Sequence, residues 1–92
     1  MSANFTNERL RQFINRNFPR ARARDLRNDD PLLESGIVDS LGVLDIVSFI
    51  ESDLGVIVDD EDLVRENFGS IRRIAAYIEA KQKDLPRAQY SI

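Results

Sequence analysis

Three stretches of the chain repeat apolar residues at intervals of three and four positions, the spacing of one face of an α-helix. The first covers residues 4–18 and carries Leu10, Phe13 and Ile14. It ends before Pro19, because a proline disfavours helical geometry in the residue that precedes it. The pattern therefore predicts one amphipathic helix at the start of the chain.

The second stretch begins at Asp39-Ser40, two residue types that favour helix N-termini, and ends near Leu54, before Gly55. Its core side consists of Val43, Ile46, Val47, Ile50 and Leu54. The third stretch opens at Gly69-Ser70, and its apolar stripe consists of Ile71, Ile74, Ala75 and Ile78. Each stretch predicts a helix, the last one ending near Lys81.

The segments between these helices predict connections and one further helix. Residues 19–38 begin with charged residues and continue with apolar ones that can pin the segment to the core, namely Leu32, Leu33, Ile37 and Val38. Residues 56–58 are apolar but have no other strand to pair with, so we expect a buried loop. A short third helix is expected from Asp59 or Asp60 through Arg65.

Together these elements predict an all-α domain over residues 1–82, a four-helix bundle of three longer helices and a short third one. Residues 83–92 include Pro86, and we expect them to form a frayed tail. The predicted core consists of Leu10, Phe13, Ile14, Ile46, Ile50, Leu54, Ile71, Ile74 and Ile78.

The composition supports one domain and lowers the expectation of an enzyme. A chain of 92 residues with 42% hydrophobic residues is enough for one core. It contains no cysteine, which excludes disulfides and cysteine metal sites, and no histidine, the commonest general base near neutral pH. We find no signal peptide and no apolar run of about eighteen residues, so we expect a cytoplasmic protein that is not bound to a membrane.

Charge is divided unevenly along the chain. Residues 1–38 hold seven arginines against five acidic residues, a net of +2. Residues 39–92 hold six basic against eleven acidic residues, a net of −5, and the two sum to the overall −3. An acidic second half disfavours nucleic-acid binding and suggests basic protein partners.

The predicted second helix carries apolar residues on its outer face, where polar ones are expected. Placing its residues about 100° apart puts the following on the side opposite the core: Leu41, Leu44, Asp45, Ser48 and Glu51. Either the connection around residues 31–38 covers the two leucines, or they form part of a docking face for partner proteins. We favour the docking face because of the segment beside it.

The segment 33–41 resembles the phosphopantetheine attachment signature of acyl carrier and peptidyl carrier proteins, whose core is Asp-Ser-Leu at the start of the second helix. Asp39-Ser40-Leu41 matches this core in full. The likeness continues through Gly36 before the motif, Leu54-Gly55 at the helix end, and residues 68–71 before the last helix. It covers roughly residues 5–81 and agrees with the predicted bundle.

The resemblance implies a carrier without catalytic activity of its own. A 4′-phosphopantetheine arm, donated by coenzyme A, is expected on Ser40, with Asp39 near the metal or the transferase during loading. The implied partners are a phosphopantetheinyl transferase, an acyl- or aminoacyl-activating ligase, and downstream acyl-transfer enzymes. We expect a monomer that presents thioester-bound acyl intermediates in fatty-acid, polyketide or related biosynthesis.

The chain departs from the fatty-acid-synthesis type of carrier in three places. An extra residue lengthens the approach to the serine, Gly42 replaces an acidic residue, and Ser48 and Ser52 make the outer face less acidic. These departures resemble a specialised stand-alone carrier. The cargo therefore stays open, and the alternative is an aminoacyl or peptidyl carrier loaded by an amino-acid-activating ligase.

Elementary chemistry supports Ser40 as an attachment point without reference to the family. A phosphodiester there would sit at a helix N-terminus, where free N–H groups and the helix dipole favour an anion. Since the chain lacks cysteine, any thioester chemistry needs a thiol from a prosthetic group. The alternative is that Ser40 only caps the helix, a contribution of about 1 kcal/mol.

Rival functions have weaker support. A serine hydrolase would need a nucleophile elbow and a histidine, and residues 59–62 lack the spacing of a calcium-binding EF-hand. Residues 63–83 could imitate a DNA-binding helix-turn-helix with Arg72 and Arg73, but they lie in the acidic half of the chain.

Two further features allow alternative interpretations. Residues 20–27, with four arginines, form either a solvated loop, which we favour, or a basic docking patch. Phe49 either packs in the core, which we favour, or lines an acyl channel.

Overall fold

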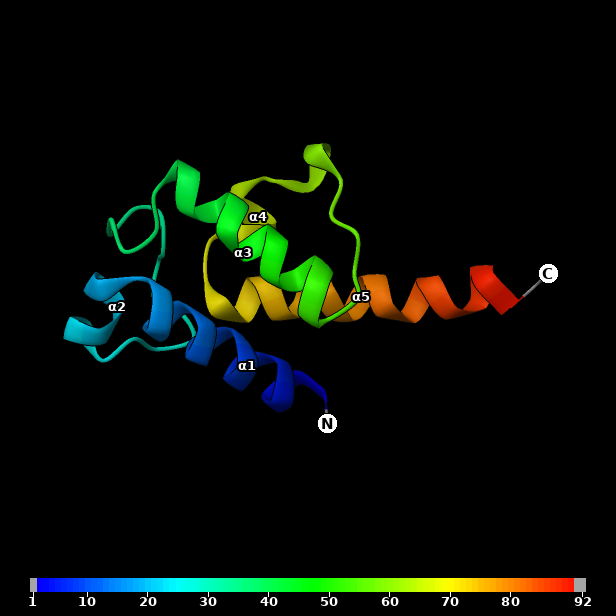
Figure 1. Cartoon of the computed structure of the whole chain (residues 1–92), viewed down its shortest axis with the longest axis horizontal. Helices are drawn as coiled ribbons and strands as arrows, with labels where there is room; N and C mark the ends of the chain where they lie inside the picture. The colour runs from blue at the N-terminus through cyan, green and yellow to red at the C-terminus, as the bar shows by residue number, and fades with distance from the viewer. Residues whose placement is uncertain (1, 91–92) are drawn as a thin grey trace.

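The regular structure of the chain is helical throughout the part described by the computed structural model, residues 2–90. The elements are α1 (Ser2–Asn17), α2 (Pro19–Arg24), α3 (Ser40–Asp53), a 3₁₀ turn (Asp60–Asp62), α4 (Arg65–Phe68) and α5 (Ile71–Tyr90). In Figure 1, α1, α3 and α5 form the bundle, while α2 lies at the end where α1 finishes. The predicted all-α class is confirmed.

The core lies between the three long helices. Seven of the nine predicted core residues are fully buried: Leu10, Ile14, Ile46, Ile50, Ile71, Ile74 and Ile78. The other two, Phe13 and Leu54, are only partly buried and pack against this cluster. Phe13 stacks on Phe49 with their ring centroids 4.5 Å apart, so Phe49 packs between α1 and α3, as the packing interpretation expects.

A helix replaces the loop that we expected after Pro19. Pro19 occupies the first position of α2, where its fixed φ suits a helix and its missing N–H costs nothing. Ala21 is buried, and the Arg22 guanidinium donates to the carbonyls of Asn15 and Arg16 at the end of α1. Residues 19–24 are therefore a helix packed on the end of α1 and not the expected loop, although Arg20, Arg22 and Arg27 are exposed to solvent as expected.

The predicted short third helix is also misplaced. Residues 60–62 make only a 3₁₀ turn, and α4 starts after Val64, whose φ of −126° and ψ of 163° are extended. Aspartate is a poor helix former and four acidic residues in a row repel one another, so the run 59–62 caps and turns instead of continuing. The helix forms where Phe68 can be buried.

The last helix starts where expected but continues to Tyr90, past the end predicted near Lys81. Figure 1 shows its final turns extending beyond the rest of the bundle. That residues 83–92 fray stays a prediction, which the lost hydrogen bond at Pro86 supports, while 91–92 lie outside the described residues. Among the described helices, none combines the length and the apolar character needed to cross a bilayer.

Candidate functional site

The matched signature lies at the start of α3, where Asp39 caps the helix and Ser40 is its first residue. The Asp39 carboxylate accepts a hydrogen bond from the Gly42 N–H at 2.7 Å, and the Asp39 backbone is extended. Capping is therefore done by Asp39, and the interpretation of Ser40 as the cap is wrong. Ser40 is exposed, so its hydroxyl can be reached from solvent at a helix N-terminus.

The connection before Ser40 is held to the core by its apolar second half, as predicted. Leu32, Ile37 and Val38 are buried. The Leu32 N–H donates to the Gly69 carbonyl at 2.8 Å, and the Val38 N–H donates to the Leu32 carbonyl at 3.0 Å. These bonds fix the chain two residues before the serine, so Ser40 is presented from a rigid base.

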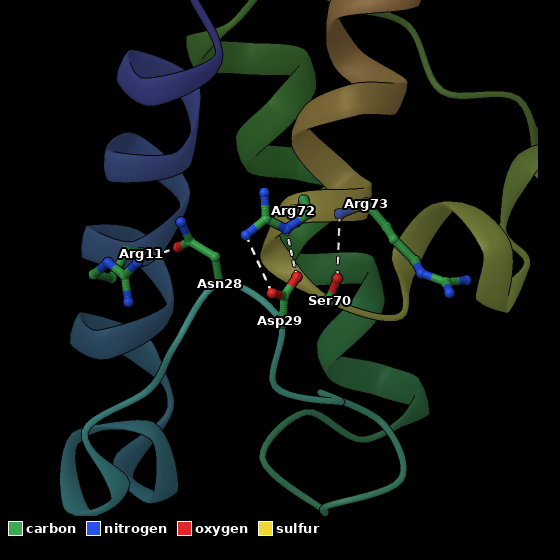
Figure 2. A network of polar contacts seen from close by, with 6 residues as sticks. All are labelled: Arg11, Asn28, Asp29, Ser70, Arg72 and Arg73. Carbon is green, nitrogen blue, oxygen red and sulfur yellow. Dashed lines mark hydrogen bonds and ion pairs between the residues drawn. The ribbon is translucent and has the colours of Figure 1, made fainter.

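Polar contacts fix the earlier part of the same connection between two helices (Figure 2). Arg11 of α1 donates to Asn28, and Arg72 of α5 forms a two-bond ion pair with Asp29. The hydrogen bond from Arg72 and its positive charge hold the pKa of Asp29 below its ordinary value. The Arg72 N–H also donates to the Asn28 carbonyl at 3.0 Å, so the loop is bound to α5 through backbone as well as side chains.

The N-terminus of α5 completes this network. Ser70 is buried, and its hydroxyl accepts a hydrogen bond from the Arg73 N–H at 3.2 Å (Figure 2). The bond caps the helix at the place where the sequence predicted its start. The Gly69 carbonyl accepts a hydrogen bond from the Leu32 N–H. This bond connects the start of α5 to the segment that leads to Ser40.

Gly42 has a packing role that explains why a larger residue is absent there. It is buried, and a Cβ at this position would lie 2.6 Å from Cε1 of Phe18, closer than side chains pack. Gly36 has a φ of +82°, a conformation that favours glycine, and its carbonyl accepts a hydrogen bond from Arg20 at 3.2 Å. Gly42, a departure from the common signature, and Gly36, which matches it, are therefore both in contact with the start of α2 or the residue before it.

The proposed partner face is exposed along α3. Leu41 and Leu44 are 75% and 53% exposed, so residues 31–38 do not cover them. Asp45, Ser48 and Glu51 are also exposed, although the Glu51 carboxylate accepts a hydrogen bond from the Val58 N–H at 3.1 Å. Their role in docking stays a prediction.

Three large apolar residues outside α3 are exposed among the described residues, and Phe5, at 57%, is the first. Ile57 is 61% exposed between buried Val56 and Val58, and Val64 is 42% exposed. The extended backbone around residue 57 alternates its side chains between core and solvent, which is the period of a strand without a partner. That alternation was the available signal, and the prediction of a wholly buried loop was wrong at Ile57.

The rival sites gain nothing from the geometry. Within the described residues, no group of three or more acidic side chains is arranged to hold a metal ion. The helix before the supposed recognition helix, α4, has only four residues, and Arg72 is paired with Asp29. α4 is too short to serve as the first helix of a helix-turn-helix, and Arg72 is not available for a phosphate while it is paired with Asp29.

The residues at the start of α3 suit a covalently attached phosphopantetheine. Ser40 offers an exposed hydroxyl, and the first turn of α3 offers backbone N–H groups that stabilise an added phosphate. The cap at Asp39 uses the Gly42 N–H and leaves the hydroxyl available for modification. These observations fit the group without requiring any rearrangement of the fold.

Comparison with known proteins agrees with this geometry. Residues 8–78 match the family model described as a phosphopantetheine attachment site. A chain from a solved structure titled "Crystal structure of FAD-dependent dehydrogenase" is 33% identical with a TM-score of 0.68, covering 75% of this chain and 97% of that one. No curated protein matches. The chain belongs to the phosphopantetheine attachment family of carrier proteins, whose cofactor is a covalently bound 4′-phosphopantetheine.

Proposed function

We propose that Ser40 is the attachment point and that the protein carries acyl intermediates as thioesters, presenting them to partner enzymes of fatty-acid, polyketide or related biosynthesis. The observation that carries this proposal is the division of roles at the start of α3. Asp39 caps the helix, and the exposed Ser40 hydroxyl, inside the matched segment, is left for modification. The chain itself is proposed to be a carrier and not an enzyme.

The residues around Ser40 have distinct tasks in loading. The Ser40 oxygen forms a bond to the phosphorus of the phosphopantetheine half of coenzyme A. The bond from that phosphorus to the bridging oxygen of the pyrophosphate breaks, adenosine 3′,5′-bisphosphate leaves with that oxygen, and the hydroxyl proton is released. The backbone N–H groups of the first turn stabilise the resulting negative charge. Once attached, the group supplies the thiol that this cysteine-free chain lacks.

Asp39 is proposed to serve the transferase as well as the helix. Its carboxylate is exposed and bonded to Gly42, so it can approach the enzyme-bound magnesium ion while keeping its cap. The implied partners beyond the transferase are an acyl- or aminoacyl-activating ligase and downstream acyl-transfer enzymes. A cytoplasmic monomer remains the expected state.

The nature of the cargo is the second part of the proposal. An acyl group is our first candidate and an aminoacyl group the alternative, since the outer face of α3 carries fewer acidic residues than the fatty-acid type resembled. The matched solved structure bears the name of a FAD-dependent dehydrogenase. The 92 residues here lack the glycine-rich fingerprint of a dinucleotide site, so we propose flavin-dependent dehydrogenases as a partner class, not as an activity of this chain.

Intact-mass spectrometry tests the attachment. Incubation with a broad-specificity phosphopantetheinyl transferase, coenzyme A and Mg²⁺ should add one phosphopantetheine to the wild-type chain. Ser40→Ala should receive none, and Ser48→Ala, an exposed serine of the same helix, should be modified like the wild type. An unchanged wild-type mass under conditions that modify a known carrier would contradict the proposal, and modification of Ser40→Ala would place the arm elsewhere.

A further inference from the structure

A hollow of about 630 Å³ lies between the start of α3 and the start of α2, and Ser40 itself is not one of its lining residues. The residues on both sides of the serine, Asp39 and Leu41, line it. Residues 25–39, which connect α2 to α3, are called the approach loop. The other walls of the hollow come from Phe18, Pro19 and Arg20 around the start of α2 and from Gly36 and Ile37 in this loop. An arm on Ser40 would therefore start close enough to fold back into this hollow.

The walls are held in place by contacts specific to this chain. Phe18 packs against Gly42 so closely that a Cβ there would be 2.6 Å from the ring. Arg20 donates to the Gly36 carbonyl at 3.2 Å, which ties α2 to the approach loop across the hollow. Two of the three departures seen in the sequence, the lengthened connection before Ser40 and Gly42, meet the arginine-rich segment here.

The chemistry of the walls suits the arm in two parts. Its phosphodiester is an anion, and Arg20 is the cation among the lining residues. Its pantetheine part is uncharged, with two methyl groups and two amides, so the rings of Phe18 and Pro19 can cover the methyl groups. Asp39 and Asp45 also line the hollow and would repel the phosphate, so the phosphate is expected on the Arg20 side, while the uncharged pantetheine is not repelled.

We propose that the pantetheine arm on Ser40 rests in this hollow between α2 and α3, with its phosphate toward Arg20 and its methyl groups against Phe18. The inference rests on the attachment at Ser40 proposed above. It assigns to the arginine-rich segment the task of holding the resting arm on the side of α3 that faces α1 and α2. Release from Arg20 would then precede delivery of the cargo to a partner.

Nuclear magnetic resonance of the holo-protein tests the resting position. The arm is added enzymatically from coenzyme A carrying ¹³C in the two pantetheine methyl groups, and the mass confirms its addition. Nuclear Overhauser contacts are then measured from these methyl groups to the protein. We expect contacts with the ring protons of Phe18 and the side chain of Ile37. In Arg20→Glu they should weaken by roughly two- to fivefold, the effect of one exposed charge pair.

Two matched variants make the result specific. Arg20→Lys keeps the charge and should retain most of the contact intensity. Arg73→Glu makes the same charge reversal at an exposed residue of α5 that lines a separate depression, and it should leave the contacts unchanged. Full modification of these variants, shown by mass, ensures that only the resting position is compared.

The failures of the two proposals can be told apart. If the arm is added but its methyl groups contact only Leu44 or Val64, or no residue at all, the resting position is overturned while Ser40 remains the attachment point. Equal weakening in Arg20→Glu and Arg73→Glu would also overturn it, because a general charge effect would then explain the result. If no arm is added to the wild type, both proposals fail.

Discussion

The three residues of the motif Asp39-Ser40-Leu41 have different structural roles at the start of α3. Asp39 satisfies the backbone of the first turn, Ser40 offers its hydroxyl, and Leu41 is 75% exposed beside them. Gly42 then allows Phe18 to approach the helix. Each side chain has its own surroundings and its own task, so neighbouring substitutions should have unrelated consequences.

The contrast between an exposed and a buried residue of α3 yields a prediction about Leu44. Leu44→Glu should change the free energy of unfolding by less than about 0.5 kcal/mol, because Leu44 is 53% exposed. Ile50→Ala should cost about 2–5 kcal/mol, because Ile50 is fully buried and its truncation leaves a cavity. Thermal and urea unfolding of both variants measures the difference.

The same Leu44→Glu variant should accept the arm on Ser40 and yet be loaded or unloaded more slowly by partner enzymes. Single-turnover assays at two salt concentrations separate the lost apolar contact from charge effects around Asp45 and Glu51, which salt screens. Destabilisation as severe as that of Ile50→Ala would show that Leu44 belongs to the core and that the docking face is misassigned.

At the scale of elements, periodicity predicted the three long helices because each buries one regular apolar stripe. The burial of Ile46 and Ile50 follows from their spacing alone. The short elements were beyond this reasoning: among the side chains of α2 that the structure describes, Ala21 alone is buried, and hydrogen bonds from Arg22 hold this helix to the end of α1. The spacing of apolar residues along the chain does not predict hydrogen bonds of this kind between two helices.

The site divides in the same way. Asp39-Ser40-Leu41 was recognisable from the sequence, and the cap at Asp39 is of a type that sequence statistics favour. The hollow beside it was not recognisable, since it needs Phe18, Arg20 and Gly36 to meet across the approach loop. Gly42 was visible as a departure from the family, but its reason lies in the ring that packs on it.

The tie between the approach loop and α5 predicts a pH-dependent stability. The hydrogen bond from Arg72 lowers the pKa of Asp29 from its ordinary value of 3.8, so the pair stabilises the folded state only while Asp29 is ionised. Its contribution is complete above pH 3.8 and is lost as the pH falls through the lower folded-state value. Asp29→Asn should therefore be less stable than the wild type at pH 7, and the difference should shrink below pH 3.8.

Urea unfolding of the wild type and of Asp29→Asn, from neutral pH down to well below the ordinary pKa of aspartate, measures this difference. The Arg72→Gln background is the control, because Asp29→Asn should there lose its pH-dependent effect. A stability difference between the wild type and Asp29→Asn that persists unchanged at the lowest pH would show that the ion pair does not contribute.

At the scale of the molecule, the basic and acidic residues are concentrated in different halves of the chain. The basic excess lies in the first 38 residues, where Arg11, Arg20 and Arg22 are occupied with carbonyl or amide oxygens of the fold. The acidic excess lies in the half that contains α3 and α5. A basic partner surface would therefore approach α3, while the arginines hold the approach loop and α2 in position.

This distribution, with the absence of histidine, predicts that the purified protein neither hydrolyses esters nor binds duplex DNA at physiological salt. Binding to DNA needs a basic surface that displaces counterions, but Arg72 is neutralised by Asp29 and its half of the chain is acidic. Hydrolysis needs a base beside Ser40, and the chain has no histidine to provide it. A chromogenic ester assay and a duplex-DNA mobility shift measure the two activities, with Ser40→Ala and the pair Arg72→Glu, Arg73→Glu as comparisons.

Each variant removes the group on which one rival function depends. Hydrolysis that Ser40→Ala abolishes would support the serine-hydrolase hypothesis. DNA binding that the arginine reversals weaken would support the helix-turn-helix hypothesis.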